Sequence, residues 1–262
     1  MTSKTEPRLL CYDLGEGVTA FSTTRHGGVS EANYASFNIN PYCGDSADHV
    51  ARNRQLLADR LGLPASHIVL PHQVHGIEHR AVAPELLDMS DAVRDKILDG
   101  VDMVTTSMTG VCIGVSTADC IPVLLYDPVA RATAAIHAGW RGTLQRICQR
   151  AVMAMQLHYG ATPDRLRAVV GPGISLANFE VGQEVYDQFL QAGFDLTETA
   201  EWHTKWHLDL PGINIRELIG CGVAPEHIHH AGICTFDHAD DYFSARRLGI
   251  DSGRIYTGIL MR

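Results

Sequence analysis

Short apolar runs bounded by turn-forming residues follow one another through the middle of the chain. Residues 111–116, 121–126 and 132–136 each have the length and composition of a buried β-strand. The pair Asp127-Pro128 separates the last two runs and favours a tight connection. We therefore expect these two strands to be neighbours in an antiparallel hairpin.

Apolar residues recur at helical spacing on both sides of this region. From Leu144 to Met155 they predict a buried amphipathic helix with Thr143 as its cap. Ser46 and Gly62 bracket a second helix, and residues 84–98 form a polar, partly helical insertion. Further strands are expected at residues 68–70, 166–170, 206–210 and 255–261, and further helices at 179–193 and 211–220.

Strands and helices are thus mixed, without the regular alternation of a parallel α/β protein. This order predicts the α+β class, with mixed and antiparallel sheets flanked by helices. A chain of 262 residues can form one large domain or two small ones, and its sequence shows no repeat or linker that would divide it. We therefore expect a single domain over residues 1–262.

The predicted hairpin brings two chemically active side chains together. Cys120 begins one strand and His137 ends its neighbour. Because the two ends of an antiparallel hairpin lie side by side, these residues can meet within hydrogen-bonding or metal-ligand distance.

A third ligand can come from the histidines before this region. His72, His75 and His79 have the spacing of one helical face. Pro71 and Gly76 bracket the run, however, and favour a strand, a loop and a second strand. His75, beside Gly76, is then the better ligand candidate, with His72 in the loop and His79 facing solvent.

One thiolate and two imidazoles form a ligand set that suits zinc. Three protein ligands leave one position open, which distinguishes a catalytic zinc ion from a structural one, and zinc lowers the pKa of bound water to about 7. A plainer interpretation stays open at this point. Cys120 can be a small buried residue and His137 a strand-end histidine, with no metal bound.

Composition and charge exclude some classes of partner. The net charge is −9 and no basic cluster interrupts it, so nucleic acid is not an expected partner. No apolar run approaches the length of a membrane span, and the first residues lack the apolar core of a signal peptide. Seven cysteines without a C-x-x-C motif fit neither a secreted disulfide framework nor a zinc ribbon. We therefore predict a cytoplasmic protein with no membrane partner.

Several short motifs together resemble the laccase-domain family, also called the YfiH-like or multicopper polyphenol oxidoreductase family. They occur in the order of that family and span most of the chain, with departures in the insertion at 84–98 and at His26 and His72. The motifs are S-T-T-R-H-G-G-V-S at 22–30, Q-V-H-G at 73–76, T-A-D-C at 117–120, I-H-A-G-W-R-G at 136–142, G-P-G-I at 171–174, F-E-V-G at 179–182, and C-T and S-A-R-R near the end.

The resemblance implies a zinc site at His75, Cys120 and His137, which are the ligand positions of these motifs. It also implies an α+β fold similar to the catalytic domain of cytotoxic necrotizing factor toxins. Members of the family are described as enzymes that phosphorolyse adenosine, inosine, guanosine and methylthioadenosine and that deaminate adenosine. Purine nucleosides and phosphate are the partners that follow from this resemblance, for a monomer or small homo-oligomer.

Phosphorolysis also needs a group that holds phosphate beside the ribose, where positive charge develops. Arg25, at a glycine-rich turn, and Arg141, at a helix start, are candidates for this anion. Asn38 and Arg246 complete our set of candidate substrate-binding residues.

Three other functions stay open. In a cysteine hydrolase acting on cell-wall precursors or amides, Cys120 would be the nucleophile and His137 its base. In a binding module, the same residues would form a structural or storage metal site. Copper-dependent polyphenol oxidation, which the older family name suggests, is disfavoured because His227-x-His229 is the one H-x-H pair in the chain.

Overall fold

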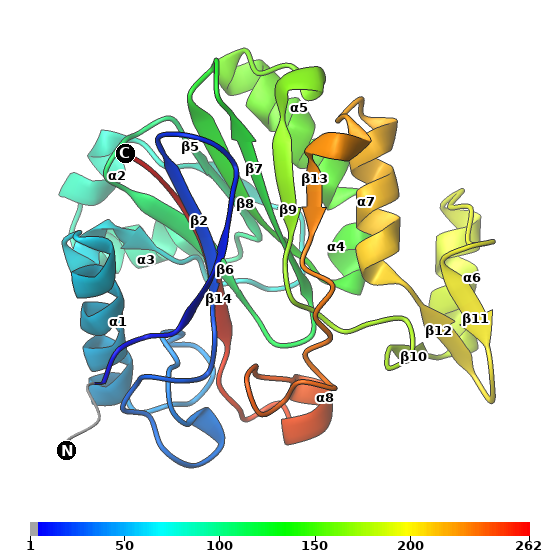
Figure 1. The fold of residues 1–262 in the computed structure, drawn as a ribbon, viewed down its shortest axis with the longest axis horizontal. Coiled ribbons are helices and arrows are strands. Elements are labelled where there is room, and N and C mark those ends of the chain that lie inside the picture. Colours follow the sequence, from blue (N-terminus) through cyan, green and yellow to red (C-terminus); the bar gives the residue numbers. More distant parts are fainter. Residues whose placement is uncertain (1–4) are drawn as a thin grey trace.

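The computed structural model describes residues 5–262, and two β-sheets form the centre of the fold (Figure 1). The first sheet has five strands in the order β1 (Leu9–Tyr12), β2 (Val18–Thr23), β14 (Ile255–Met261), β6 (Cys112–Thr117) and β3 (Ile68–Val69). The second has six strands in the order β13 (Ile228–His230), β9 (Arg167–Val170), β7 (Ile121–Asp127), β8 (Ala132–Ala138), β5 (Met103–Thr106) and β4 (His79–Ala81).

Most strand pairs in the two sheets are antiparallel. The exceptions are the outer pairs β3–β6, β4–β5 and β13–β9, which are parallel. The mixed sheets and their helices confirm the predicted α+β class.

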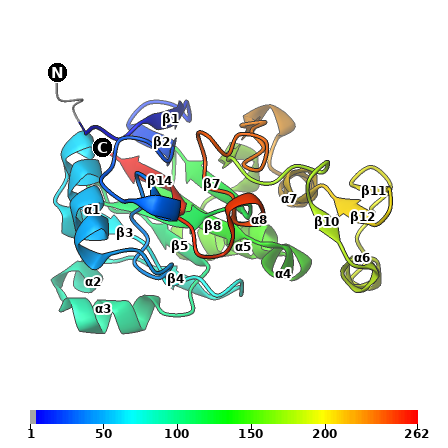
Figure 2. The same cartoon turned by 90° about the horizontal axis from the view of Figure 1, so that it is seen from below.

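Helices cover the outer faces of the two sheets (Figure 2). Helix α1 (Ala47–Leu61) packs on the first sheet, where its Leu57 joins a core cluster with Phe21 and Tyr256. Helices α5 (Ile147–Tyr159) and α7 (Leu210–Gly220) pack on the second sheet. The remaining α-helices are α2 (Pro84–Asp88), α3 (Asp91–Leu98), α4 (Trp140–Leu144), α6 (Gln183–Gln191) and α8 (Ala245–Leu248), and short 3-10 helices occur at Ala32–Tyr34, Ala65–His67, Pro163–Arg165 and Pro225–His227.

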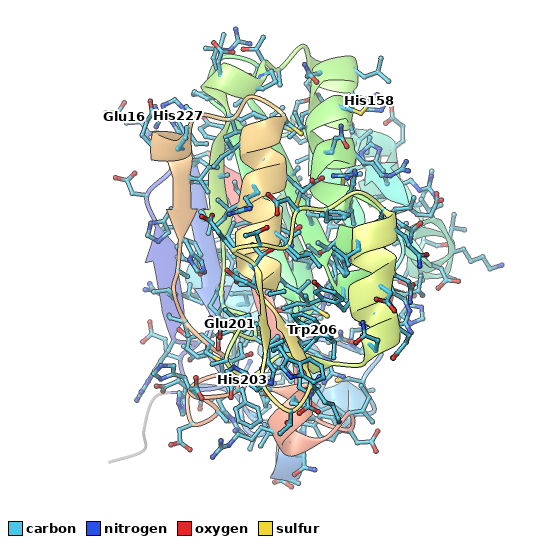
Figure 3. The ribbon with its side chains drawn as sticks, turned by 90° about the vertical axis from the view of Figure 1, so that its right-hand side faces the viewer. Glu16, His158, Glu201, His203, Trp206 and His227 are labelled. Atoms are coloured by element: carbon cyan, nitrogen blue, oxygen red, sulfur yellow. The ribbon has the colours of Figure 1, made fainter. Side chains whose placement is uncertain are left out.

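A small third sheet lies beyond α7 at one end of the molecule, together with α6 (Figures 1 and 3). Its strands are ordered β10 (Glu180–Val181), β12 (Trp206–Leu208) and β11 (Ala200–Trp202). The rings of Tyr186 and Trp206 stack with centroids 3.7 Å apart and join α6 to this sheet.

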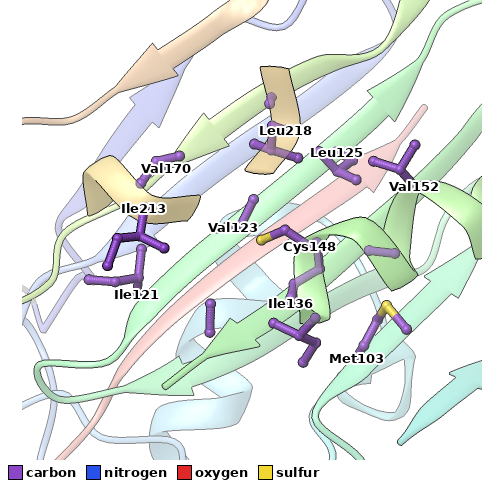
Figure 4. Packing of buried hydrophobic residues seen from close by; sticks show 14 of the residues in the cluster. Met103, Ile121, Val123, Leu125, Ile136, Cys148, Val152, Val170, Ile213 and Leu218 are labelled. Carbon is purple, nitrogen blue, oxygen red and sulfur yellow. The ribbon is translucent and has the colours of Figure 1, made fainter. Parts of the chain in front are cut away.

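Strand β7 shows why the central strands read as continuous apolar runs. Side chains alternate between the two faces of a strand, and both faces of β7 are covered. Ile121 and Val123 belong to the cluster beneath α5 and α7 (Figure 4), whereas Leu124 and Tyr126 belong to the cluster between the two sheets. The order of layers is therefore helix, sheet, sheet, helix.

Two predicted helices have different boundaries in the structure. The helix expected from Thr143 is divided, because Arg146 adopts a left-handed backbone conformation between α4 and α5. Thr143 lies inside α4, where its hydroxyl contacts Asn214 of α7, and does not act as a cap. The helix expected over 179–193 begins at Gln183, because residues 180–181 pair with β12 instead. Apolar residues keep the same spacing on both sides of Arg146 and of Gln183, so the sequence pattern did not reveal these helix boundaries.

None of the helices within residues 5–262 combines the length and the apolar character that crossing a membrane requires.

Candidate metal centre

Strands β7 and β8 form the predicted hairpin, and it joins the two reactive side chains. The register pairs Pro122 with His137, so Cys120, just before β7, lies beside the last residues of β8. The side chain of His137 is buried and that of Cys120 is partly exposed.

His75 reaches the same point from the loop between β3 and β4. Its backbone has a φ of +64°, in the left-handed region that non-glycine residues seldom occupy. The potential ligand atoms of His75, Cys120 and His137 all lie within 4.8 Å of one another. Sequence reasoning therefore selected three side chains that the fold brings together.

The chemistry and spacing of this group suit zinc. Zinc binds sulfur at about 2.3 Å and imidazole nitrogen at about 2.0–2.1 Å, which places tetrahedral ligands between 3 and 4 Å apart, roughly. The observed limit of 4.8 Å lies close to this spacing. His75 is exposed, so the open side of the group faces solvent. Among residues 5–262, this is the group of at least three His, Cys, Asp or Glu side chains that could hold a metal ion.

Gly139 leaves the room that these three residues need. A Cβ atom at this position would lie 3.0 Å from Cδ2 of His75 and 3.2 Å from Sγ of Cys120. A larger residue would therefore crowd these two ligands, and at least one of them would have to shift, which explains why glycine follows the end of β8.

A buried carboxylate fixes the orientation of His137. Oδ1 of Asp102 lies 2.6 Å from Nδ1 of His137. A carboxylate accepts hydrogen bonds, so Nδ1 carries the hydrogen and Nε2 is left for Cys120 or a metal ion. Asp102 also accepts hydrogen bonds from the backbone N–H groups of Val74, His75 and Gly76, at 3.2, 3.0 and 2.7 Å. One carboxylate thus positions both histidines.

Without a metal ion, Cys120 and His137 favour an ion pair. Burial of the thiol opposes its ionisation, but the charge of His137 and hydrogen bonds from both histidines lower the pKa of Cys120 to about 6. Burial likewise opposes protonation of His137, but the Cys120 thiolate and Asp102 raise its pKa to about 9. A thiolate of this kind is both a metal ligand and a nucleophile.

Asp119 holds Cys120 in place from the other side. It has a φ of +84°, and its carboxylate accepts hydrogen bonds from the hydroxyl of Thr235 at 2.7 Å and the backbone N–H of Arg246 at 2.6 Å. Its carbonyl oxygen accepts a hydrogen bond from Ile174 at 2.8 Å. Three motifs that are distant in sequence therefore meet at the residue before Cys120.

A cavity of about 280 Å³ opens onto the three ligands. Arg254 is the one lysine or arginine among the residues that line it. The lining residues are Asn40, Tyr42, Cys43, His72, Gln73, His75, Ser116, Thr117, Ala118, Cys120, His137, Ala245, Ile250 and Arg254.

The predicted substrate-binding arginines lie outside the lining of this cavity. The guanidinium of Arg25 donates to the carbonyl oxygens of Ala35 and Ala239, at 2.9 and 2.7 Å, and lies over the Phe243 ring. The guanidinium of Arg141 lies over the ring of Trp140, 4.3 Å from its centroid. These contacts stabilise the fold, and a role of either residue in binding an anion stays a prediction.

Asn38 and Arg246 also lie outside the cavity lining, and they hold residues of the site in place through hydrogen bonds. Asn38 is fully buried, and its side-chain oxygen accepts hydrogen bonds from the backbone N–H groups of Asn40 and Arg254, at 3.2 and 3.1 Å. It positions two lining residues and does not itself reach the cavity. The side chain of Arg246 is exposed and donates to the carbonyl oxygen of Glu180, while its backbone holds Asp119.

Sequence reasoning missed Asp102 and Arg254, and it misplaced His79. Asp102 directly precedes β5, and neither a motif nor apolar spacing marks it as part of the site. Nε2 of His79 lies 2.8 Å from the hydroxyl of Thr105, and burial lowers the pKa of His79 to about 4. This histidine is therefore half-buried and not solvent-facing.

Comparison with known proteins shows similarity over most of the chain. The sequence model of a family described as multi-copper polyphenol oxidoreductase laccase matches residues 19–262. A protein from Bacteroides thetaiotaomicron named purine nucleoside phosphorylase is 44% identical over 247 residues, which cover 93% of this chain and 92% of that protein. A protein named adenosine deaminase RL5, from an unknown prokaryotic organism, is 40% identical and covers 93% of this chain and 94% of its own length.

Solved structures have the same fold. The YfiH protein of Bacillus licheniformis superposes with a TM-score of 0.91 at 29% identity, covering 98% of this chain and 97% of that one. YlmD from Geobacillus stearothermophilus superposes with a TM-score of 0.87 at 30% identity, covering 96% and 94%.

Proposed function

This chain belongs to the multi-copper polyphenol oxidoreductase laccase family, and from that premise we propose that it is a purine nucleoside phosphorylase that also deaminates adenosine. The observation that carries the proposal is the convergence of His75, Cys120 and His137 at a cavity, in a chain whose relatives at 40% identity and above bear these two names. Adenosine, inosine, guanosine and methylthioadenosine are the proposed nucleosides, with phosphate as the second substrate.

The proposed cofactor is one zinc ion held by His75, Cys120 and His137. When bound, it supplies a Lewis acid with an open coordination position beside the cavity. The protein's own residues prepare this position. Asp102 keeps the hydrogen of His137 on Nδ1, and Gly139 lets the three ligands approach one another.

Arg254 is the residue that we propose for holding phosphate. Arg254 lines the same cavity, and its guanidinium donates hydrogen bonds to the carbonyl oxygens of Ile250, Ser252 and Gly253, at 2.9, 2.5 and 2.9 Å. A positive charge held in one place favours an anion without a further loss of side-chain entropy. Arg25 and Arg141 stay candidates for the same role, and their variants are compared with that of Arg254.

Product analysis with adenosine tests the proposal. With phosphate, the purified protein is expected to release adenine and ribose 1-phosphate, and with or without phosphate it is expected to form inosine. Removal of metal by a chelator should stop both reactions, and added zinc should restore them. If neither free base nor inosine forms, the proposed function is wrong.

A cysteine hydrolase is the second candidate, because the lowered pKa of Cys120 and the raised pKa of His137 describe an activated thiolate. This function would persist in metal-free protein, whereas the nucleoside reactions would not. A structural metal site would instead show as a fall in melting temperature after chelation. Copper-dependent polyphenol oxidation would need further clusters of metal ligands, and residues 5–262 contain no second cluster of His, Cys, Asp or Glu side chains that could hold a metal ion.

We also propose the cellular compartment, domain organisation and oligomeric state of the protein. The seven cysteines are free, which is usual in a reducing compartment, so we place the protein in the cytoplasm. We further propose one catalytic domain over residues 1–262, acting as a monomer or small homo-oligomer without a nucleic-acid partner.

A further inference from the structure

His72 stands on the wall of the metal cavity, next to but separate from the three ligands. Its ring stacks on Tyr42 with centroids 4.2 Å apart and an interplanar angle of 29°. Its Nδ1 atom lies 2.7 Å from Oδ1 of Asp99. Tyr42 and Asp99 therefore hold the imidazole ring in one orientation, by stacking on its face and by a hydrogen bond at Nδ1.

These contacts determine what His72 offers to a ligand. The Asp99 carboxylate can only accept, so Nδ1 carries a hydrogen, and an imidazole with its one hydrogen on Nδ1 presents Nε2 as an acceptor. Tyr42 covers one face of the ring, and the His72 side chain is nevertheless 40% exposed. These two contacts leave the opposite face of the ring and the Nε2 edge unoccupied, on a residue that lines the cavity.

Two neighbouring amide side chains on this wall, Gln73 and Asn40, already make hydrogen bonds within the protein. The amide of Gln73 pairs with the backbone of Ser116, accepting from its N–H at 2.8 Å and donating to its carbonyl oxygen at 2.9 Å. The amide of Asn40 donates to the Ser116 hydroxyl at 2.5 Å and accepts from the N–H of Tyr42 at 2.6 Å. Nε2 of His72 makes no hydrogen bond within residues 5–262, so it is an acceptor that is left for a substrate.

We propose that His72, held by Asp99 and Tyr42, binds the six-membered ring of the purine through a hydrogen bond to Nε2. This inference rests on the proposed function, which makes purine nucleosides the substrates. Adenine carries an N–H donor at N6 on this ring, and hypoxanthine and guanine carry one at N1. His72 is then a specificity-determining residue that selects purines with a donor at this edge.

A pair of nucleosides and a pair of variants test the assignment. Inosine has the N1–H donor, and 6-methylpurine riboside has no N–H on its six-membered ring. His72→Phe keeps an aromatic ring against Tyr42 but removes Nε2, and His203→Phe makes the same change at an exposed histidine outside the cavity lining as a control. Dissociation constants are measured by calorimetry without phosphate, on protein with its metal content and melting temperature recorded.

His72→Phe is expected to weaken inosine binding about tenfold, the size of one hydrogen bond, and to leave 6-methylpurine riboside unchanged. His203→Phe should change neither constant. If both nucleosides weaken equally, or neither does, the assignment is wrong. Should His72→Phe fail to fold, Asp99→Asn serves instead. It releases Nδ1, so the hydrogen can move to Nε2, and inosine should again weaken relative to the methyl analogue.

The same samples separate this inference from the proposed function. Wild-type protein is assayed for release of hypoxanthine from inosine and phosphate. If both nucleosides bind with the expected His72 dependence but no base is released, the proposed phosphorolysis fails and the assignment of His72 stands. If wild-type protein binds neither nucleoside, both proposals are wrong.

Discussion

Nδ1 of His137 lies 2.6 Å from Oδ1 of Asp102, and that carboxylate also accepts backbone hydrogen bonds from the loop that carries His75. A single side chain therefore determines the orientation of two of the three ligands. Such partners of metal ligands typically account for 10- to 100-fold in metal affinity, roughly.

Replacement of Asp102 by Asn should weaken zinc binding by about 10- to 100-fold. The amide can donate toward Nδ1, so the hydrogen of His137 would move to Nε2 and block the ligand atom. Competition with a chromophoric chelator measures the affinity. Asp99→Asn is the matched control, because Asp99 contacts His72 and none of the three ligands, and its zinc affinity should stay unchanged. Equal affinities for wild type and Asp102→Asn would contradict this role.

Replacement of Gly139 by Ala should disrupt the metal site more than the fold. The added Cβ would lie 3.0 Å from His75 and 3.2 Å from Cys120, so at least one of these side chains must move. We expect zinc content to fall by at least half at equal free zinc, as measured by mass spectrometry of metals. Gly220→Ala, where a Cβ meets no atom within 4 Å, should keep its zinc. Full occupancy in Gly139→Ala would show that the ligands do not need this space.

The metal-free protein should be alkylated at Cys120 with a midpoint near pH 6, since the pKa of Cys120 is lowered to about 6. The reactive form is the thiolate, so the rate should be high above this pH and fall as the pH decreases through it. Iodoacetamide labelling followed by peptide mass spectrometry gives the rate at this residue. A midpoint between 8 and 9, the ordinary range of a cysteine, would mean that His137 does not pair with the thiol.

Replacement of Arg254 by Ala should raise the KM for phosphate at least about tenfold and change the KM for inosine much less. The reason is the loss of the one fixed positive charge on the cavity wall, where a hydrogen bond to a charged group contributes about 1.5–3 kcal/mol. Arg25→Ala, Arg141→Ala and Arg246→Ala are compared in the same assay. If one of these three raises the KM for phosphate and Arg254→Ala does not, the earlier candidates are right and Arg254 is not the anion ligand.

The hairpin of β7 and β8 shows how far the sequence alone could lead. Its apolar runs and the turn at Asp127-Pro128 are local signals, so the meeting of Cys120 and His137 followed from them. The layer order of the two sheets did not follow, because it depends on pairings between distant strands such as β2 and β14.

Asp102 and Arg254 show why the rest of the site could not be predicted. Asp102 reads as a polar residue in a turn, and only the fold reveals that it is buried against His137. Arg254 is one of many arginines, and it lines the cavity because β14 returns its end of the chain to β6. His75 could be selected from the sequence, because Pro71 and Gly76 favour a loop at this point, and the resemblance to the family's motifs led to the same residue.

The central claim is that three side chains bind one zinc ion on which nucleoside turnover depends, and Cys120→Ala tests it most directly. Zinc per chain and the release of base from inosine and phosphate are measured on the same samples of wild type, Cys120→Ala and the control Cys11→Ala, which changes an exposed cysteine of β1. We predict about one zinc per chain and base release in wild type and control, and loss of both in Cys120→Ala, because the thiolate is one of only three protein ligands. Undiminished zinc and turnover in Cys120→Ala would contradict the account.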